Sequence, residues 1–147
     1  MRDGSRPGGR AARILLVEDS VADHKLVQLA LEEAGSSSRL QHVEDGAEAM
    51  TVLDAVGVGK QQRPDLVLLD LNLPRVSGVD VLRRVKGDQV LRTIPVVVFS
   101  TSRADVDVSV AYACGANAYV VKPVDLHRFM AVVRDIEEHW TGVVRLP

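Results

Sequence analysis

The fold is decided by the stretch Arg63-Pro64-Asp65-Leu66-Val67-Leu68-Leu69-Asp70-Leu71-Asn72-Leu73-Pro74. Its apolar run, residues 66–69, follows a proline and an acid and ends at a second acid. Such a short run is typical of a β-strand that is buried on both faces. Because ligands bind outside the carboxyl ends of the strands in open parallel sheets, Asp70 is a candidate site residue. A single acid at such a place is more often a turn cap, so the rest of the chain has to decide.

Four further apolar runs have the same character, and a helical pattern follows each of the five. These runs cover residues 14–17, 40–43, 94–99 and 118–121. The run at 40–43 is less uniformly apolar and is expected near an edge of the sheet, whereas the run at 94–99 is the most apolar and is expected near the centre. We therefore predict an α/β fold, a doubly wound five-stranded parallel sheet in the flavodoxin-like order 2-1-3-4-5, with five helices on its two faces.

Serine and acid spacing marks two of the helix starts. Ser20 with Asp23, and Ser102 with Asp105, have the spacing of a capping box, in which serine and acid each accept a backbone N–H. The helix after Ser102 is expected to run over about residues 104–114. Its inward-facing positions are predicted to be Val106, Val110 and Ala113.

The length of 147 residues suits one domain with a buried core. Residues 1–13 are rich in Gly, Arg and Ser and are predicted to form a disordered arm with nothing to bury. Residues 14–140 are predicted to be the domain, and residues 141–147 a short C-terminal tail. The last helix follows Asp125, and its inner stripe is predicted to be Phe129, Val133, Ile136 and Trp140.

The composition excludes several classes of protein. Hydrophobic residues make up 46% and aromatic residues only 3%, which favours an aliphatic core. The formal net charge of −2 gives no strong field toward nucleic acid or a membrane surface. The single cysteine, Cys114, excludes an internal disulfide and fits a reducing compartment. Since no apolar run approaches the roughly 20 residues that cross a bilayer, and no signal region precedes the first strand, we expect a cytoplasmic protein.

The residues that follow the strands complement one another chemically. The strand ends carry Glu18-Asp19, Asp70, Ser100 and Lys122, and in a doubly wound sheet these ends lie on one edge. Neighbouring carboxylates stay ionised only beside a cation, and their hard oxygens suit Mg²⁺. Lys122 and Ser100 are suited to hold a phosphoryl group that Asp70 attacks to form an aspartyl phosphate. Taken singly, these residues have plainer explanations as helix caps, a turn hydroxyl and a solvated lysine.

These residues make the chain resemble the receiver domain of bacterial two-component response regulators. The resemblance covers about residues 13–140. The residues that carry it are Glu18-Asp19, Asp70 within residues 68–74, Gly78, Ser100 and Lys122-Pro123. It implies that Asp70 accepts a phosphoryl group from a phosphohistidine of a sensor histidine kinase. It also implies Mg²⁺ bound by Asp19, Asp70 and the backbone carbonyl of Asn72, with Glu18 acting through water.

The resemblance further implies a switch at the same strand ends. Lys122 would pair with the phosphoryl group or with Asp70, and Ser100 and Thr101 would stabilise the phosphoryl group. Ser100 would swing toward that group, and Tyr119 would turn inward behind it. The bond between Lys122 and Pro123 is cis in the family. Ser100 stands where threonine is more frequent, which keeps the hydroxyl but loses the methyl that steers its rotamer.

A finer resemblance is to the single-domain regulators that serve bacterial phytochromes. It rests on residues 17–20 with Asp23, and on the C-terminal residues 137–140 and 144–147. Homodimers are frequent in that subgroup, so Trp140 and Leu146 are the candidate interface residues and residues 141–147 a candidate dimer arm. The alternative is that Trp140 seals the core of its own subunit. The implied partner is a sensor histidine kinase, in this subgroup a bacteriophytochrome.

Three other functions share parts of this pattern. An aspartyl-nucleophile phosphatase usually has a second acid two residues after the first, where this chain has Asn72. A flavin carrier needs a phosphate-binding loop after the first strand, where Glu18-Asp19 would repel phosphate. A non-phosphorylated receiver-like scaffold commonly lacks an acid or the lysine, and this chain keeps them all. We expect no enzyme acting on other substrates, no DNA-binding domain after residue 147, and signalling by docking or phosphorelay.

Overall fold

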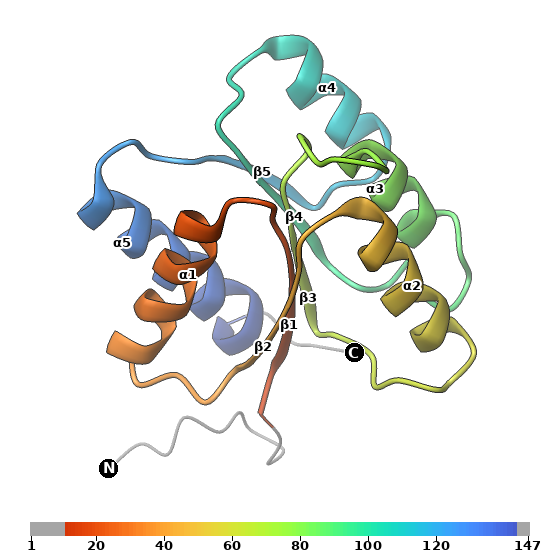
Figure 1. Cartoon of the computed structure of the whole chain (residues 1–147), viewed down its shortest axis with the longest axis horizontal. Coiled ribbons are helices and arrows are strands. Elements are labelled where there is room, and N and C mark those ends of the chain that lie inside the picture. Colours follow the sequence, from red (N-terminus) through yellow and green to blue (C-terminus); the bar gives the residue numbers. More distant parts are fainter. Residues whose placement is uncertain (1–10, 144–147) are drawn as a thin grey trace.

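The computed structural model shows a central parallel sheet covered by helices on both faces (Figure 1). Helices α1 (Val21–Glu33) and α5 (Leu126–Glu137) cover one face and contact each other. Helices α2 (Gly46–Gly57), α3 (Gly78–Lys86) and α4 (Asp105–Ala113) cover the opposite face. The predicted α/β architecture is therefore confirmed.

The sheet has the strand order β2-β1-β3-β4-β5, and every neighbouring pair is parallel. The strands are β1 (Arg13–Val17), β2 (Arg39–Val43), β3 (Leu66–Leu69), β4 (Val96–Ser100) and β5 (Ala118–Val121). This order confirms the prediction, including the edge position of β2. The run at 94–99, which was predicted near the centre, contributes β4, an interior strand, whereas the middle of the sheet is occupied by β3.

Alternate side chains of each strand enter two separate cores. In β1, Leu15 and Val17 pack with residues of α2, α3 and α4, whereas Ile14 and Leu16 pack with residues of α1 and α5. Because both faces of the sheet are covered, the inner strands are apolar throughout, as the sequence indicated. The two cores fix the carboxyl ends of the strands, and those ends carry the candidate site.

Helix α1 begins as predicted, but α4 does not. Ser20 accepts a hydrogen bond from the backbone N–H of Asp23 (3.2 Å). The N-cap of α4 is Ala104, which makes no side-chain cap, and the hydroxyl of Ser102 donates to Asp107 instead. The predicted capping box at Ser102 is wrong because the helix starts two residues too late for it, with Asp105 as its first residue instead of its third. The predicted inner face of α4 is also wrong, since Val106 is 65% exposed and Ala111 is the buried residue.

The structure describes residues 11–143. Ala12, which was predicted to lie in a disordered arm, is buried, and its carbonyl accepts from the backbone N–H of Arg39 (2.7 Å). After α5 the chain continues in a π-helical segment, η1 (Glu138–Val143). Trp140 in this segment is partly buried against the core under α1 and α5, which agrees with the alternative that it seals its own subunit. Leu146 and most of the predicted arm lie outside the described residues.

Within the described part of the chain, none of the helices has both the length and the apolar character that a membrane crossing requires.

Candidate functional site

Three acids that follow β1 and β3 lie together at the carboxyl edge of the sheet. One carboxylate oxygen from each of Glu18, Asp19 and Asp70 lies within 4.8 Å of the others. The strands β1 and β3 are paired neighbours, and the backbone N–H of Asp70 donates to the carbonyl of Val17 (3.0 Å), so their ends are held side by side. Glu18 and Asp70 are buried, whereas Asp19 is exposed. An oxygen-rich group of this kind fits a hard divalent cation such as Mg²⁺.

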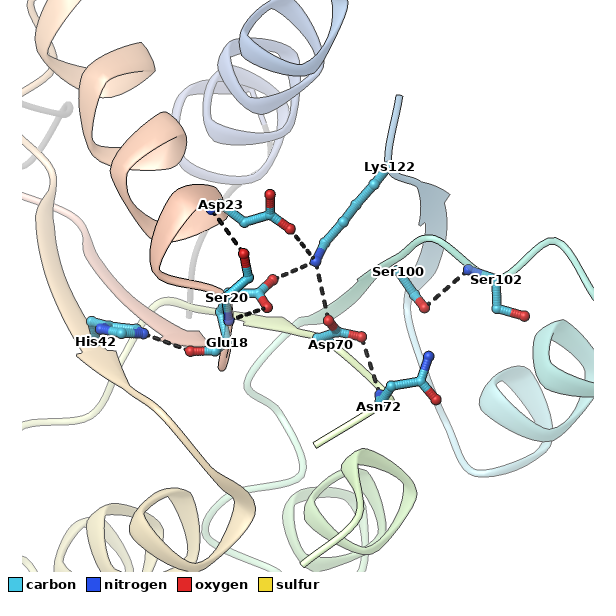
Figure 2. A network of polar contacts seen from close by, with 9 residues as sticks. All are labelled: Glu18, Ser20, Asp23, His42, Asp70, Asn72, Ser100, Ser102 and Lys122. Carbon is cyan, nitrogen blue, oxygen red and sulfur yellow. Dashed lines mark hydrogen bonds and ion pairs between the residues drawn. The ribbon is translucent and has the colours of Figure 1, made fainter. Parts of the chain in front are cut away.

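The ammonium group of Lys122 lies among carboxylates from three different segments (Figure 2). Its Nζ is 2.5 Å from Oε1 of Glu18, 2.7 Å from Oδ2 of Asp23 and 3.0 Å from Oδ2 of Asp70. An ammonium group has three N–H donors, so these three carboxylates use all of them. Lys122 is only 5% exposed, and this arrangement lets a buried lysine keep its charge.

Burial and ion pairing shift the pKa values of Lys122 and Glu18 in opposite directions. Burial by itself lowers the pKa of Lys122, but hydrogen bonds to Asp23 and Glu18 and the charge of Asp70 outweigh it, so the pKa is raised. At Glu18, burial is the larger effect and raises the pKa of the carboxyl to about 7, although Lys122 acts against it. The site therefore combines a lysine whose charge is stabilised by its partners with a carboxyl whose ionised form is disfavoured by burial.

The loop after β3 holds Asp70 from both sides. Oδ1 of Asp70 accepts from the backbone N–H of Asn72 (3.1 Å), while Oδ2 faces Lys122. The first residue of α3, Gly78, donates its N–H to the carbonyl of Leu71 (3.1 Å). A Cβ at Gly78 would lie 2.4 Å from the carbonyl oxygen of Asp70 and 2.5 Å from Cα of Leu71. Only glycine therefore lets α3 approach the loop this closely, which explains the Gly78 noted in the sequence.

The predicted switch residues meet at Ser102. Ser100 is fully buried, and its hydroxyl accepts from the backbone N–H of Ser102 (3.3 Å). The hydroxyl of Tyr119 donates to the carbonyl of Ser102 (2.9 Å), and the partly buried ring packs against the core under α2, α3 and α4. Thr101, which lies between Ser100 and Ser102 in the sequence, is exposed. Ser100 and Tyr119 are thus linked through one residue of the loop that leads into α4.

Two residues of the cluster were not predicted to belong to it. Asp23 was interpreted as a helix cap, and its backbone does serve the cap, but its carboxylate binds Lys122. His42, near the end of β2, contacts the carbonyl of Glu18 through Nε2 (2.7 Å) and stacks on His24 at 3.7 Å between ring centroids. A polar residue close to the carboxyl end of β2 is a signal that could have identified His42, since β2 pairs with β1.

The peptide bond between Lys122 and Pro123 is trans, because the described residues contain no cis peptide bond. This differs from the cis bond that the family resemblance implied. The trans form is the ordinary one before proline, favoured by about 0.5–1 kcal/mol.

Comparison with known proteins agrees with this geometry. Residues 14–134 match the family model of the response regulator receiver domain. The response regulator Rcp1 of Synechocystis is 42% identical over 135 residues, which cover 91% of this chain and 92% of Rcp1. The probable methanogenesis regulatory protein FilR2 of Methanothrix harundinacea is 40% identical over 134 residues, which cover 91% of this chain and 86% of FilR2.

Two solved structures are similar over nearly the whole domain. The Mn²⁺-bound form of Rcp1 has a TM-score of 0.86 at 41% identity and covers 92% of this chain and 99% of its own. The phosphorylated cyanobacterial phytochrome response regulator RcpA has a TM-score of 0.89 at 41% identity and covers 94% of this chain and 99% of its own. The chain is thus similar to phytochrome response regulators, and it belongs to the response regulator receiver domain family.

Proposed function

We propose that the protein is a single-domain response regulator that accepts a phosphoryl group on Asp70 from a sensor histidine kinase. One observation carries this proposal: the Asp70 carboxylate lies both within 4.8 Å of the Glu18 and Asp19 carboxylates and 3.0 Å from the Lys122 ammonium. A nucleophile, a set of metal ligands and a fixed cation are thereby in one place.

The metal in this proposal is Mg²⁺. Asp19, Asp70 and the backbone carbonyl of Asn72 would bind it, with Glu18 acting through water. The donors are all hard oxygens, and similarity to Rcp1, whose Mn²⁺-bound form has been solved, supports the binding of a divalent cation. When bound, the cation neutralises the acids and polarises the phosphoryl oxygens.

The residues of the chain have separate roles in the transfer. A carboxylate oxygen of Asp70 forms a bond to phosphorus while the bond between phosphorus and the kinase histidine breaks, and the imidazole leaves. Lys122 donates to the oxygens of the moving group. Ser100 and Thr101 supply hydroxyls beside it.

The signal in this proposal is a rearrangement of the loop before α4. Ser100 turns toward the phosphoryl group, which requires its hydroxyl to leave the N–H of Ser102. Tyr119, whose hydroxyl donates a hydrogen bond to the carbonyl of Ser102, then moves inward, and α4 shifts with it. Phosphorylation would shift the populations of two arrangements of this segment. The protein would catalyse only its own phosphorylation and dephosphorylation.

The partner would be a histidine kinase in the cytoplasm, and similarity to RcpA supports a phytochrome. We also propose a homodimer. Since Trp140 packs on its own core, the tail with Leu146 is the better candidate for the contact. Size-exclusion chromatography of the full chain, and of a chain ending at residue 143, tests this: a smaller species for the shorter chain alone supports the tail contact.

Transfer from a kinase tests the main proposal. Radiolabelled, autophosphorylated histidine kinases, including one phytochrome, are mixed with the wild type and with Asp70→Asn. The proposal expects an acid-stable, base-labile label on the wild type alone. A label that remains on Asp70→Asn overturns it, and no label from any kinase or small donor favours the scaffold. Repeated release of phosphate from an added ester would instead favour the phosphatase.

A further inference from the structure

Lys122 has three carboxylate partners, but only two of them also belong to the candidate metal group. Glu18 and Asp70 contribute oxygens both to Lys122 and to the three-acid group with Asp19. Asp23 bonds Lys122 at 2.7 Å and is not part of that group. It comes from the first turn of α1, on the far side of the ammonium from Asp70 (Figure 2).

The carboxylate oxygens of the two shared acids, Glu18 and Asp70, all have hydrogen-bond partners in the structure. Oε2 of Glu18 accepts from the backbone N–H of Ser20 (3.1 Å), while its Oε1 faces Lys122. Both oxygens of Asp70 also have partners, Asn72 and Lys122. A bound cation must draw on these same oxygens, and a phosphoryl group would occupy one oxygen of Asp70. Asp23 is therefore the one partner of Lys122 in this cluster that neither event engages.

The position of Asp23 is fixed independently of its carboxylate. Its backbone N–H donates to Ser20, and α1 continues regularly behind it. Its side chain is 25% exposed, whereas that of Lys122 is 4% exposed, so Asp23 is the more solvent-accessible partner of this ion pair. An asparagine at this position would keep the cap and the shape but lose the charge.

We propose that Asp23 is a positioning residue for phosphoryl transfer: its carboxylate anchors the Lys122 ammonium while the metal and the phosphoryl group occupy Glu18 and Asp70. This rests on the proposed function, because the reaction concerned is phosphorylation of Asp70. Without the carboxylate of Asp23, Lys122 would be held only by Glu18 and Asp70. Once the metal and the phosphoryl group occupy these two acids, the ammonium would move away from its position beside Asp70.

The first measurement is the rate of phosphorylation by acetyl phosphate at saturating Mg²⁺, together with the Mg²⁺ concentration that gives half that rate. Asp23→Asn is expected to lower the saturated rate about tenfold, as loss of an outer partner of a reacting group commonly does. Asp23→Glu, which keeps the charge on a longer side chain, is expected to restore most of the rate. Glu33→Gln removes an exposed charge from the last turn of α1 and is the matched control, expected to leave the rate unchanged.

The second measurement does not require phosphorylation. The ¹⁵N–¹H signal of the Lys122 ammonium, assigned with Lys122→Arg, is recorded with and without Mg²⁺. A held ammonium exchanges its protons slowly, so the signal is expected to persist with Mg²⁺ in the wild type and to vanish in Asp23→Asn.

The outcomes distinguish the role inferred for Asp23 from the proposed phosphorylation of Asp70. If Asp23→Asn keeps the ammonium signal with Mg²⁺, or recovers the full rate at saturating Mg²⁺, Asp23 is not the anchor and the inference is overturned. If the wild type is not phosphorylated by any donor, the proposed function fails, and the ammonium signal still decides whether Asp23 holds Lys122.

Discussion

Replacing Gly78 by alanine should disturb both the fold and the site through a single methyl group. The added Cβ would lie 2.4 Å from the carbonyl oxygen of Asp70 and 2.5 Å from Cα of Leu71, where ordinary contacts are 3.4–4 Å. Both atoms belong to the backbone, so no side chain can rotate away. The start of α3 and the loop after β3 must separate by roughly 1 Å. This separation strains the hydrogen bond from the N–H of Gly78 to the carbonyl of Leu71.

This separation sets the size of the effect. Overpacking of this kind costs about 1–3 kcal/mol, and alanine recovers less than about 1 kcal/mol through its helix propensity. We therefore expect the free energy of unfolding to fall by about 2 kcal/mol, or the melting temperature by about 4–8 °C for a chain of this size. Because Asp70 moves with the loop, phosphorylation by acetyl phosphate should slow by about a hundredfold.

Urea unfolding and the phosphorylation rate measure the two effects. The matched control is Gly57→Ala in α2, where the added Cβ would meet only Nη2 of Arg84 at 3.7 Å. That variant should be as stable as the wild type or up to about 1 kcal/mol more stable, with an unchanged rate. A Gly78→Ala protein within about 0.5 kcal/mol of the wild type would refute the packing argument. A destabilised variant with a normal rate would refute the link between α3 and Asp70.

Three further predictions concern the site. In the proposed site ionised Glu18 holds Mg²⁺ through water, and burial raises the pKa of its carboxyl to about 7, so the apparent dissociation constant for Mg²⁺ should rise about tenfold per pH unit as the pH falls below 7. Calorimetry from pH 6 to 8 checks this, with Glu18→Gln expected to flatten the profile; a flat wild-type profile contradicts it. Tyr119→Phe removes the bond to the carbonyl of Ser102 and should cost about 1 kcal/mol in urea unfolding, whereas Tyr119→Ala should weaken the phosphate dependence of partner binding. If Tyr119→Ala leaves that dependence intact, the tyrosine is not part of the switch. His42→Leu removes the contact with the carbonyl of Glu18 and should weaken Mg²⁺ binding several-fold, while His42→Gln, which keeps an N–H donor, should weaken it less. Equal losses in the two variants would mean that the donor is not what matters.

The fold and the inner part of the site could be predicted because local patterns and one rule of topology determine them. The strands are short apolar runs that end in polar residues, and strands of a parallel sheet present their carboxyl ends at one edge. Glu18, Asp70 and Lys122 therefore had to meet, and the structure brings them together. The roles assigned to them in phosphorylation remain predictions.

The remaining features depend on contacts that a local pattern does not reveal. Asp23 has a complete local explanation as a cap, and its bond to Lys122 joins residues 99 positions apart. The face of α4 was assigned wrongly because its nine residues carry apolar side chains all around, so Val106 could be placed inside as readily as Ala111. Ala12 is small enough to be buried at the start of the sheet although it lies between the Gly- and Arg-containing residues 8–10 and Arg13.

The central claim is that Asp70 accepts a phosphoryl group in a reaction that requires a divalent cation. The most direct test is the intact mass of the wild type and of Asp70→Asn after treatment with acetyl phosphate, with Mg²⁺ and with a chelator. The account predicts the mass of one phosphoryl group added to the wild type with Mg²⁺, and none in the other three samples. A phosphoryl group that persists on Asp70→Asn, or that forms equally well in the chelator, would contradict it.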